Sequence, residues 1–148
     1  MAEVVLHELV ERDDQLRGAV RVTSAGTARW HVGSPMDPRA RSALDRAGLT
    51  AAGSPARFAG RAFLEDLDVA LVMTREHRDD VAARRVTPGL EILLLRNILE
   101  PGLDLDLADP YYGDDRDFDE CLETITRAGQ RWVTSESRRR PDGGSSSV

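Results

Sequence analysis

Two continuous apolar runs separated by a polar stretch constrain the fold of this chain more than any other feature of its sequence. Asp68–Met73 and Leu90–Leu95 are apolar along nearly their whole length, as strands buried on both faces of a sheet are. Arg75–Arg84, between them, is rich in charged residues and predicts an exposed helix. A strand, a helix and a second strand in this order form a βαβ unit with parallel strands. The sequence therefore predicts an α/β fold with a mostly parallel sheet.

The same alternation extends over the rest of the chain and predicts a three-layer architecture, with helices on both faces of the sheet. Ala19–Ser24 has the composition of a strand. Further helices are expected at Glu3–Leu16, Arg39–Ala47, Phe63–Leu67 and Asp117–Val133. The first helix starts almost at Met1, although a first helix in such a fold normally crosses over from a preceding strand. We therefore expect the sheet to lack its first strand.

Composition and charge exclude several classes of protein. The 148 residues suit one domain, which we expect at 1–137, followed by a disordered Arg/Gly/Ser tail at 138–148. A single cysteine, Cys121, excludes an internal disulfide and a Cys-rich zinc site. The apolar runs are too short to span a bilayer, and no signal-peptide pattern follows Met1. The net charge of −6 argues against nucleic-acid binding, and the use of arginine for all 20 basic residues is typical of a GC-rich bacterial genome. We expect a cytoplasmic domain.

The segment Asp109-Pro110-Tyr111-Tyr112-Gly113 is the strongest chemical signal in the sequence. Proline fixes the turn and Gly113 lets the chain reverse, so that one carboxyl and two phenol rings are presented on one loop. A carboxyl placed beside apolar rings can act as a general acid. The alternative is a simple helix-entry turn, with Asp109 solvated and the tyrosines used for packing.

A second signal lies in the loop that follows the first expected strand, from Ser24 to Pro35. It places Trp30 just beyond the carboxyl end of a strand, which is the edge where open α/β sheets bind ligands. Trp30 is therefore a candidate stacking wall for an aromatic substrate. The alternative is that its indole only covers the core.

Taken together, these stretches resemble the low-molecular-weight protein-tyrosine phosphatases. The motifs SAGT, WHVG, DPRA and DPYYG followed by DF occur here in that family's order and approximate spacing. The resemblance extends from Met1 to about Arg138, and DPYYG is its most specific element. It implies the fold of that family and the hydrolysis of phosphotyrosine through a cysteinyl-phosphate intermediate.

The resemblance also implies a role for each candidate residue. Asp109 would be the general acid that protonates the departing phenolate, and Trp30 the aromatic wall that grips phosphotyrosine. Tyr111 and Tyr112 would line the cleft, and Ser24 would brace the phosphate loop. The tyrosyl oxygen leaves as an anion whose conjugate acid has a pKa of about 10, so a positioned acid helps substantially. The implied partner is a phosphotyrosine-containing protein or a small aryl phosphate, with no cofactor, metal, nucleic acid or membrane.

The family's nucleophile loop, C-x-G-N-x-C-R-S-P, does not occur in these residues. In the family it lies between the first strand and the first helix, where the Cys thiolate attacks phosphorus and the Arg and backbone N–H groups hold the oxygens. It commonly runs straight into Met-Ala-Glu, the residues found here from Met1. We therefore expect an N-terminally truncated domain, in which residues 1–148 alone are inactive.

The one cysteine in the chain is not a substitute nucleophile. The segment from Cys121 to Arg127 fits the pattern C-x5-R, but it has no glycine to turn backbone amides toward a phosphate. Acidic residues precede it, and Cys121 falls on the apolar side of an expected helix. We expect a core cysteine.

Two other functions remain open. The chain could be a non-catalytic phosphatase remnant that acts as an interaction module, without turnover. It could also be an arsenate reductase of the same fold, but those enzymes need further cysteines to pass on a disulfide, and this chain has only Cys121. The DPYYG segment and Trp30 favour an aryl phosphate over both arsenate and phosphoarginine.

Overall fold

The predicted βαβ unit is present in the structure, a computed structural model that describes residues 1–50, 55–85, 87–140 and 146–147. Strands β2 (Val69–Val72) and β3 (Glu91–Leu94) pair in parallel, with Val69 opposite Glu91 and Val72 opposite Leu94. Helix α4 (Arg75–Arg84) connects them with the predicted bounds. It begins where the Thr74 hydroxyl accepts a hydrogen bond from the backbone N–H of His77.

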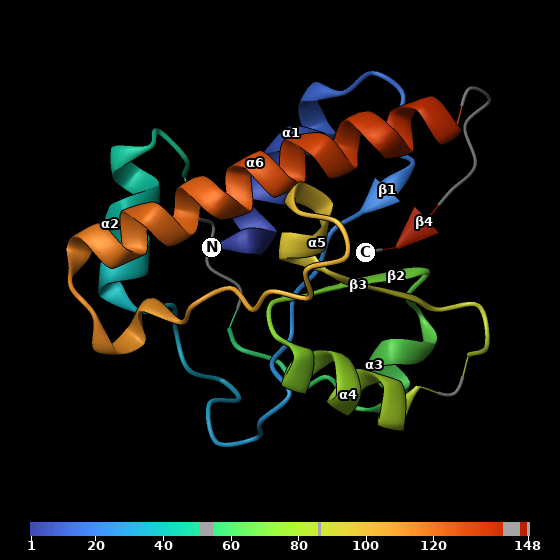
Figure 1. Cartoon of the computed structure of the whole chain (residues 1–148), viewed down its shortest axis with the longest axis horizontal. Helices are drawn as coiled ribbons and strands as arrows, with labels where there is room; N and C mark the ends of the chain where they lie inside the picture. The colour runs from blue at the N-terminus through green and yellow to red at the C-terminus, as the bar shows by residue number, and fades with distance from the viewer. Residues whose placement is uncertain (51–54, 86, 141–145, 148) are drawn as a thin grey trace.

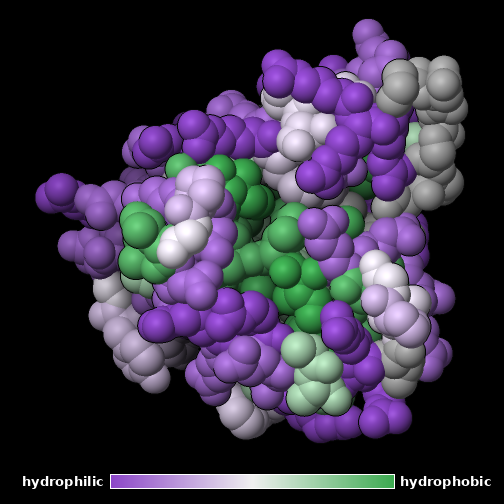
Figure 2. Space-filling view, turned by 45° about the vertical axis from the view of Figure 1, so that its right-hand side comes forward, coloured by the Kyte–Doolittle hydropathy of each residue, from purple (hydrophilic) through white to green (hydrophobic). Residues whose placement is uncertain are grey.

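A second parallel pair is formed by β1 (Val20–Arg21) and β4 (Ser146–Ser147). The strand expected at Ala19–Ser24 is thus only two residues long, because a strand exists only where a neighbour supplies hydrogen bonds. Among the described residues, the β1–β4 pair is not hydrogen-bonded to the β2–β3 pair. A cavity of about 190 Å³, mostly lined by apolar side chains, lies against both β2 and the segment after β1, and Figure 2 shows apolar residues gathered in a hollow of the surface.

Helices cover both sides of the β2–β3 pair (Figure 1). On one side lie α1 (Ala2–Arg12), α5 (Leu95–Leu99) and α6 (Asp115–Arg139), and on the other α3 (Arg61–Glu65) and α4. Helix α2 (Pro38–Arg46) packs on the N-terminal half of α6, and the short 3-10 helix η1 (Pro110–Tyr112) precedes α6. The α/β fold with helices on both faces is therefore confirmed.

Several helices differ from the sequence prediction. Helix α1 ends at Arg12 rather than Leu16, because the Asp13 carboxylate accepts hydrogen bonds from the backbone N–H groups of Gln15 and Leu16 and turns the chain. Helix α3 begins and ends two residues earlier than expected. Helix α5 was not expected, since it continues directly from the apolar run of β3.

Helix α6 is longer than predicted at both ends. Its start is fixed by a capping box, in which the Asp114 carboxylate accepts from the N–H of Asp117 and the Asp117 carboxylate from the N–H of Asp114. At the other end it runs to Arg139, two residues into the segment expected as a tail. The buried Glu136 carboxylate pairs there with Arg139 and Arg140, and basic side chains near a helix C-terminus are favourable. Of the remaining tail, 141–145 and 148 lie outside the described residues.

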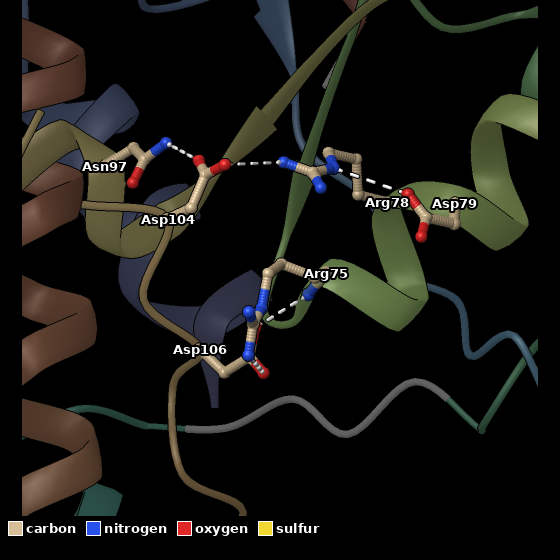
Figure 3. Close-up of polar contacts among 6 residues, drawn as sticks. All are labelled: Arg75, Arg78, Asp79, Asn97, Asp104 and Asp106. Atoms are coloured by element: carbon tan, nitrogen blue, oxygen red, sulfur yellow. Dashed lines mark hydrogen bonds and ion pairs between the residues drawn. The ribbon is translucent and has the colours of Figure 1, made fainter. Parts of the chain in front are cut away.

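Two ion-paired aspartates tie the segment before η1 to the rest of the fold (Figure 3). The Asp106 carboxylate accepts from the backbone N–H of Arg75 at 2.8 Å and pairs with its guanidinium. The Asp104 carboxylate accepts from the Asn97 side chain at 2.7 Å and pairs with Arg78. Together these contacts fix the chain where it leaves α5 and passes the end of β2, just before the DPYYG segment.

These aspartates make stability depend on acid pH. Hydrogen bonds from Arg75 and Asn97 hold the pKa values of Asp106 and Asp104 below the ordinary value of an aspartate. A folded-state pKa below the unfolded one adds stability that is complete above the unfolded pKa, near pH 4, and is lost as pH falls through the folded value. Urea midpoints should therefore fall between pH 6 and pH 3 by less in Asp106→Asn than in the unchanged protein. Asp45→Asn, at an exposed position, is the control and should retain the full fall; an equal fall in all three would contradict this account.

In the part of the chain that the structure describes, no helix is both long enough and apolar enough to cross a membrane.

Candidate functional site

A cavity of about 430 Å³ lies where the start of α1, the loop after β1 and the DPYYG segment meet. Its walls include two of the sequence-predicted residues, Ser24 and Asp109, although 85 positions separate them. Met73 and Thr74, at the carboxyl end of β2, also line it, and the Leu107 backbone N–H donates to the Met73 carbonyl at 2.8 Å. The cavity therefore lies at the strand edge where ligands of α/β sheets bind.

Asp109 lies at the turn that starts η1. Its carboxylate accepts from the backbone N–H of Tyr111 at 3.0 Å, so it caps this short helix. The side chain of Asp109 is exposed to solvent, so the tyrosine rings beside it do not bury its carboxyl group. The turn thus fixes Asp109, which also lines the cavity.

Gly113 closes this turn for a reason other than the one expected. Its backbone is extended, with φ −94°, so no left-handed conformation is needed. A Cβ atom at this position would instead overlap the Asp117 carboxylate, which caps α6. Glycine is needed here because the capping box occupies the space that a side chain would fill.

Arg39 of α2 holds the backbone of the DPYYG segment, a role that the sequence did not suggest. Its guanidinium donates to the carbonyls of Tyr111 at 2.9 Å and Gly113 at 3.2 Å, and lies 4.7 Å from the centre of the Phe118 ring. Asp37, the N-cap of α2, pairs with the same guanidinium, and this contact lowers the pKa of Asp37. The only signal for this contact was the position of an arginine in the DPRA motif.

The loss of Arg39 should loosen the turn without unfolding the domain. In Arg39→Ala, amide hydrogen exchange at Tyr111 and Gly113 is expected to speed up roughly tenfold, because the carbonyl anchors of the turn are gone. Exchange in β2 should not change. Arg41→Ala, an exposed position on the same helix, is the control; similar exchange in both variants would show that Arg39 does not hold the turn.

The three aromatic candidates do not line this cavity. Trp30 is 81% exposed, and its ring meets that of His31 edge to face at 6.3 Å between centroids. Tyr112 is 96% exposed, and its ring meets that of Tyr111 edge to face at 5.1 Å. The three rings are thus exposed to solvent. Trp30 does not cover the core, which was the alternative to its role as a stacking wall.

Ser24 connects the loop after β1 to the first turn of α1. Its hydroxyl donates to the Glu3 carboxylate at 2.6 Å, and Arg57 pairs with the same carboxylate at 3.4 Å. The start of α1 has no side-chain cap. Ser24 is therefore fixed beside the first turn of α1, whose residues also line the cavity, and the start of a helix is a favourable position for an anion.

Cys121 is buried in the core cluster formed by α1, α2 and α6 and also borders the cavity. Burial raises the pKa of its thiol to about 11, and the nearby Asp109 carboxylate acts in the same direction. The α-amino group of Met1 lies close enough to interact with it, and burial lowers the pKa of that amine. At neutral pH the thiol is protonated and is a poor nucleophile. Across the described ranges, no cluster of three or more His, Cys, Asp or Glu side chains could hold a metal ion.

Comparison with known proteins agrees with this geometry. The model of the family "Low molecular weight phosphotyrosine protein phosphatase" matches residues 1–141. The chain belongs to this family.

Two curated members of the family illustrate the relationship. The low molecular weight protein-tyrosine-phosphatase of Streptomyces coelicolor is 36% identical over 135 residues, which cover 86% of this chain and 79% of that protein. Phosphatase A of Mycobacterium tuberculosis is 39% identical over 116 residues, or 76% of this chain and 69% of the relative. Among solved structures, the protein tyrosine phosphatase of Entamoeba histolytica superposes with a TM-score of 0.83 at 19% identity, covering 93% of this chain and 88% of that one. The fold and the family are thus established independently.

Proposed function

We propose that residues 1–148 form the acid and substrate-cleft part of a protein-tyrosine phosphatase that acts in the cytoplasm, without metal or cofactor. The substrate is a phosphotyrosine-containing protein or a small aryl phosphate. The observation that carries this proposal is the meeting of Asp109, Ser24 and the uncapped start of α1 around one cavity at the carboxyl end of β2. An acid, an anion-binding helix end and a bracing hydroxyl are the groups that phosphomonoester hydrolysis needs beside its nucleophile.

In the proposed reaction a cysteine thiolate attacks phosphorus, and the bond from phosphorus to the tyrosyl oxygen breaks. Asp109 gives its proton to that oxygen, so that a neutral phenol leaves instead of a phenolate. In the second step a water molecule attacks the cysteinyl phosphate, and the Asp109 carboxylate takes up a proton from it. Inorganic phosphate and the free thiolate result, so Asp109 acts first as acid and then as base.

The nucleophile of this reaction is not Cys121, the only cysteine in these residues. Its thiol is buried among apolar side chains, and its pKa of about 11 keeps it protonated. It also lies inside α6, where the backbone N–H groups are used by the helix and cannot hold a phosphate. We propose that residues 1–148 alone do not turn over phosphotyrosine.

A strand followed by a nucleophile loop would fit between the β1–β4 pair and the β2–β3 pair. The cavity that borders β2 and the segment after β1 is largely apolar, and the buried hydroxyl of Thr23, a lining residue, has no hydrogen-bond partner among the described residues. A strand placed there would pair with the strands on either side, and a loop after it would lead to the uncapped start of α1. A C-x-G-N-x-C-R-S-P loop at that point would bring its thiolate and its arginine to Asp109.

The exposed aromatic residues are proposed to recognise the substrate. Trp30 and the pair Tyr111–Tyr112 are exposed on two segments of the chain, where a phosphotyrosine ring could contact them. Ser24, fixed by Glu3, would brace the phosphate loop.

A turnover assay tests the proposal and separates it from the alternative of a non-catalytic interaction module. Residues 1–148 and their Cys121→Ala variant should both fail to hydrolyse p-nitrophenyl phosphate. Hydrolysis that survives Cys121→Ala would contradict the proposed cysteine chemistry. Hydrolysis that Cys121→Ala abolishes would make Cys121 the nucleophile and would contradict the role given to the buried thiol. An interaction module would stay inactive even when a strand and a nucleophile loop are joined before Met1.

A further inference from the structure

Two adjoining cavities lie along the C-terminal half of α6, and they share no lining residue with the cavity at Asp109. The outer one, of about 710 Å³, lies between the end of α5 and the C-terminal half of α6. The inner one, of about 500 Å³, lies between α6 and β3. Arg131, Ser135 and Arg139 border both, so the two cavities are neighbours, and together they are called the hollow.

The outer cavity has a strong positive charge in a chain whose net charge is −6. Four arginines and no acidic residue line it, namely Arg127, Arg131, Arg138 and Arg139. Arg131 donates to the carbonyls of Ile98 and Leu99, which are neutral, so its charge is not balanced there. A favourable helix C-terminus explains basic residues only in the last turn of α6 and not Arg127, three turns earlier.

The inner cavity is lined by two residues, each of which has a buried polar atom without a hydrogen-bond partner among the described residues. These atoms are the indole Nε1 of Trp132, a side chain only 4% exposed, and the side-chain oxygen Oδ1 of Asn97. A buried donor or acceptor without a partner is costly, which favours a bound group that supplies one. Glu136 also borders this cavity, but Arg139 and Arg140 already pair with its carboxylate.

We propose that this hollow is a second ligand site, which binds a small organic phosphate. Several guanidinium groups around one space suit a phosphate dianion, whose oxygens can accept from more than one arginine. The remainder of the ligand would enter the inner cavity, beside Trp132 and Asn97 and against the apolar side chains Ile92 and Ile98. The site is separate from the proposed phosphatase cleft and does not depend on it.

The indole N–H of Trp132 provides a direct readout. In the variant Trp30→Phe, Trp132 is the only tryptophan, so one indole resonance remains in a nitrogen–proton NMR spectrum. Ribose 5-phosphate is expected to shift this resonance saturably, inorganic phosphate to bind more weakly, and ribose to have no effect. The double variant Arg127→Gln/Arg138→Gln should raise the dissociation constant for ribose 5-phosphate at least about tenfold, because two charge-assisted contacts are lost.

The control is Arg116→Gln, an exposed arginine at the other end of α6 that pairs only with Glu120 among the described residues. It should leave the dissociation constant unchanged. All the arginines replaced are exposed, and the resonance in the absence of ligand reports whether each variant is folded. No saturable shift, or equal binding by the double variant and the control, would overturn the proposal and would leave water as the partner of Trp132 and Asn97. Equal affinity for inorganic phosphate would overturn the assignment to an organic ligand.

Discussion

Residues 1–148 joined to a preceding strand and C-x-G-N-x-C-R-S-P loop are expected to hydrolyse phosphotyrosine, whereas residues 1–148 alone are expected not to. The extension would consist of about five apolar residues, enough for one strand, followed by the loop directly before Met1. It would supply a thiolate, an arginine and backbone N–H groups to a cavity that already contains Asp109 and the start of α1. We expect kcat to rise from an undetectable value to about 1 s⁻¹ or more, the range of ordinary enzymes. A phosphotyrosine peptide with detection of released phosphate is the assay.

A matched control keeps the fold and removes only the nucleophile. The same extension with serine in place of its first cysteine should bind substrate but release no phosphate. The extension should also raise the urea midpoint, because it closes the cavity between the β1–β4 and β2–β3 pairs and gives the Thr23 hydroxyl polar neighbours. A stabilised, folded extension without turnover would favour the interaction module over the phosphatase.

Asp109→Asn in the extended protein is expected to lower kcat for phosphotyrosine about 10²- to 10⁴-fold, the usual contribution of a positioned general acid. The amide is nearly the same size and can still accept from the N–H of Tyr111, so the turn should keep its shape. It has no proton to give to the leaving oxygen. Steady-state kinetics on a phosphotyrosine peptide provide kcat and KM, and KM should change little.

Asp115→Asn is the matched control for this variant, since it makes the same change in an exposed residue six positions away at the start of α6. It should retain kcat within about twofold, because an exposed first-turn carboxylate contributes only to helix stability. Equal losses in the two variants would mean that a change of net charge, rather than the loss of an acid at Asp109, lowers the rate.

The sequence was most informative where burial leaves a continuous pattern. The runs at β2 and β3 predicted parallel strands to within one residue at each end, and the charged composition of α4 predicted that helix with its observed bounds. The boundary between β3 and α5 was missed. An apolar run that contains both Leu94 and Leu95 has no periodicity with which to separate a buried strand from a buried helix turn.

The site was predictable in its parts but not in its assembly. Asp109 and Ser24 were singled out separately, and only the fold shows that they border one cavity. Arg39 was missed because its partners are the backbone carbonyls of Tyr111 and Gly113. Every residue has such a carbonyl, so the sequence does not indicate which one accepts a hydrogen bond. The open positions of Trp30 and Tyr112 could not be foreseen either, since aromatic residues on loops more often pack against a core.

The most direct test of the central claim, that Asp109 protonates the departing phenolate, uses the leaving group itself. A series of aryl phosphates whose phenols differ in pKa would be compared in the extended protein and its Asp109→Asn variant. An acid matters most for the poorest leaving group, so the loss in kcat/KM, which reports the step in which the phenol leaves, should grow steadily as the pKa of the phenol rises and nearly vanish for the most acidic phenols. A loss of the same size for every phenol would contradict the assignment of Asp109 as the general acid.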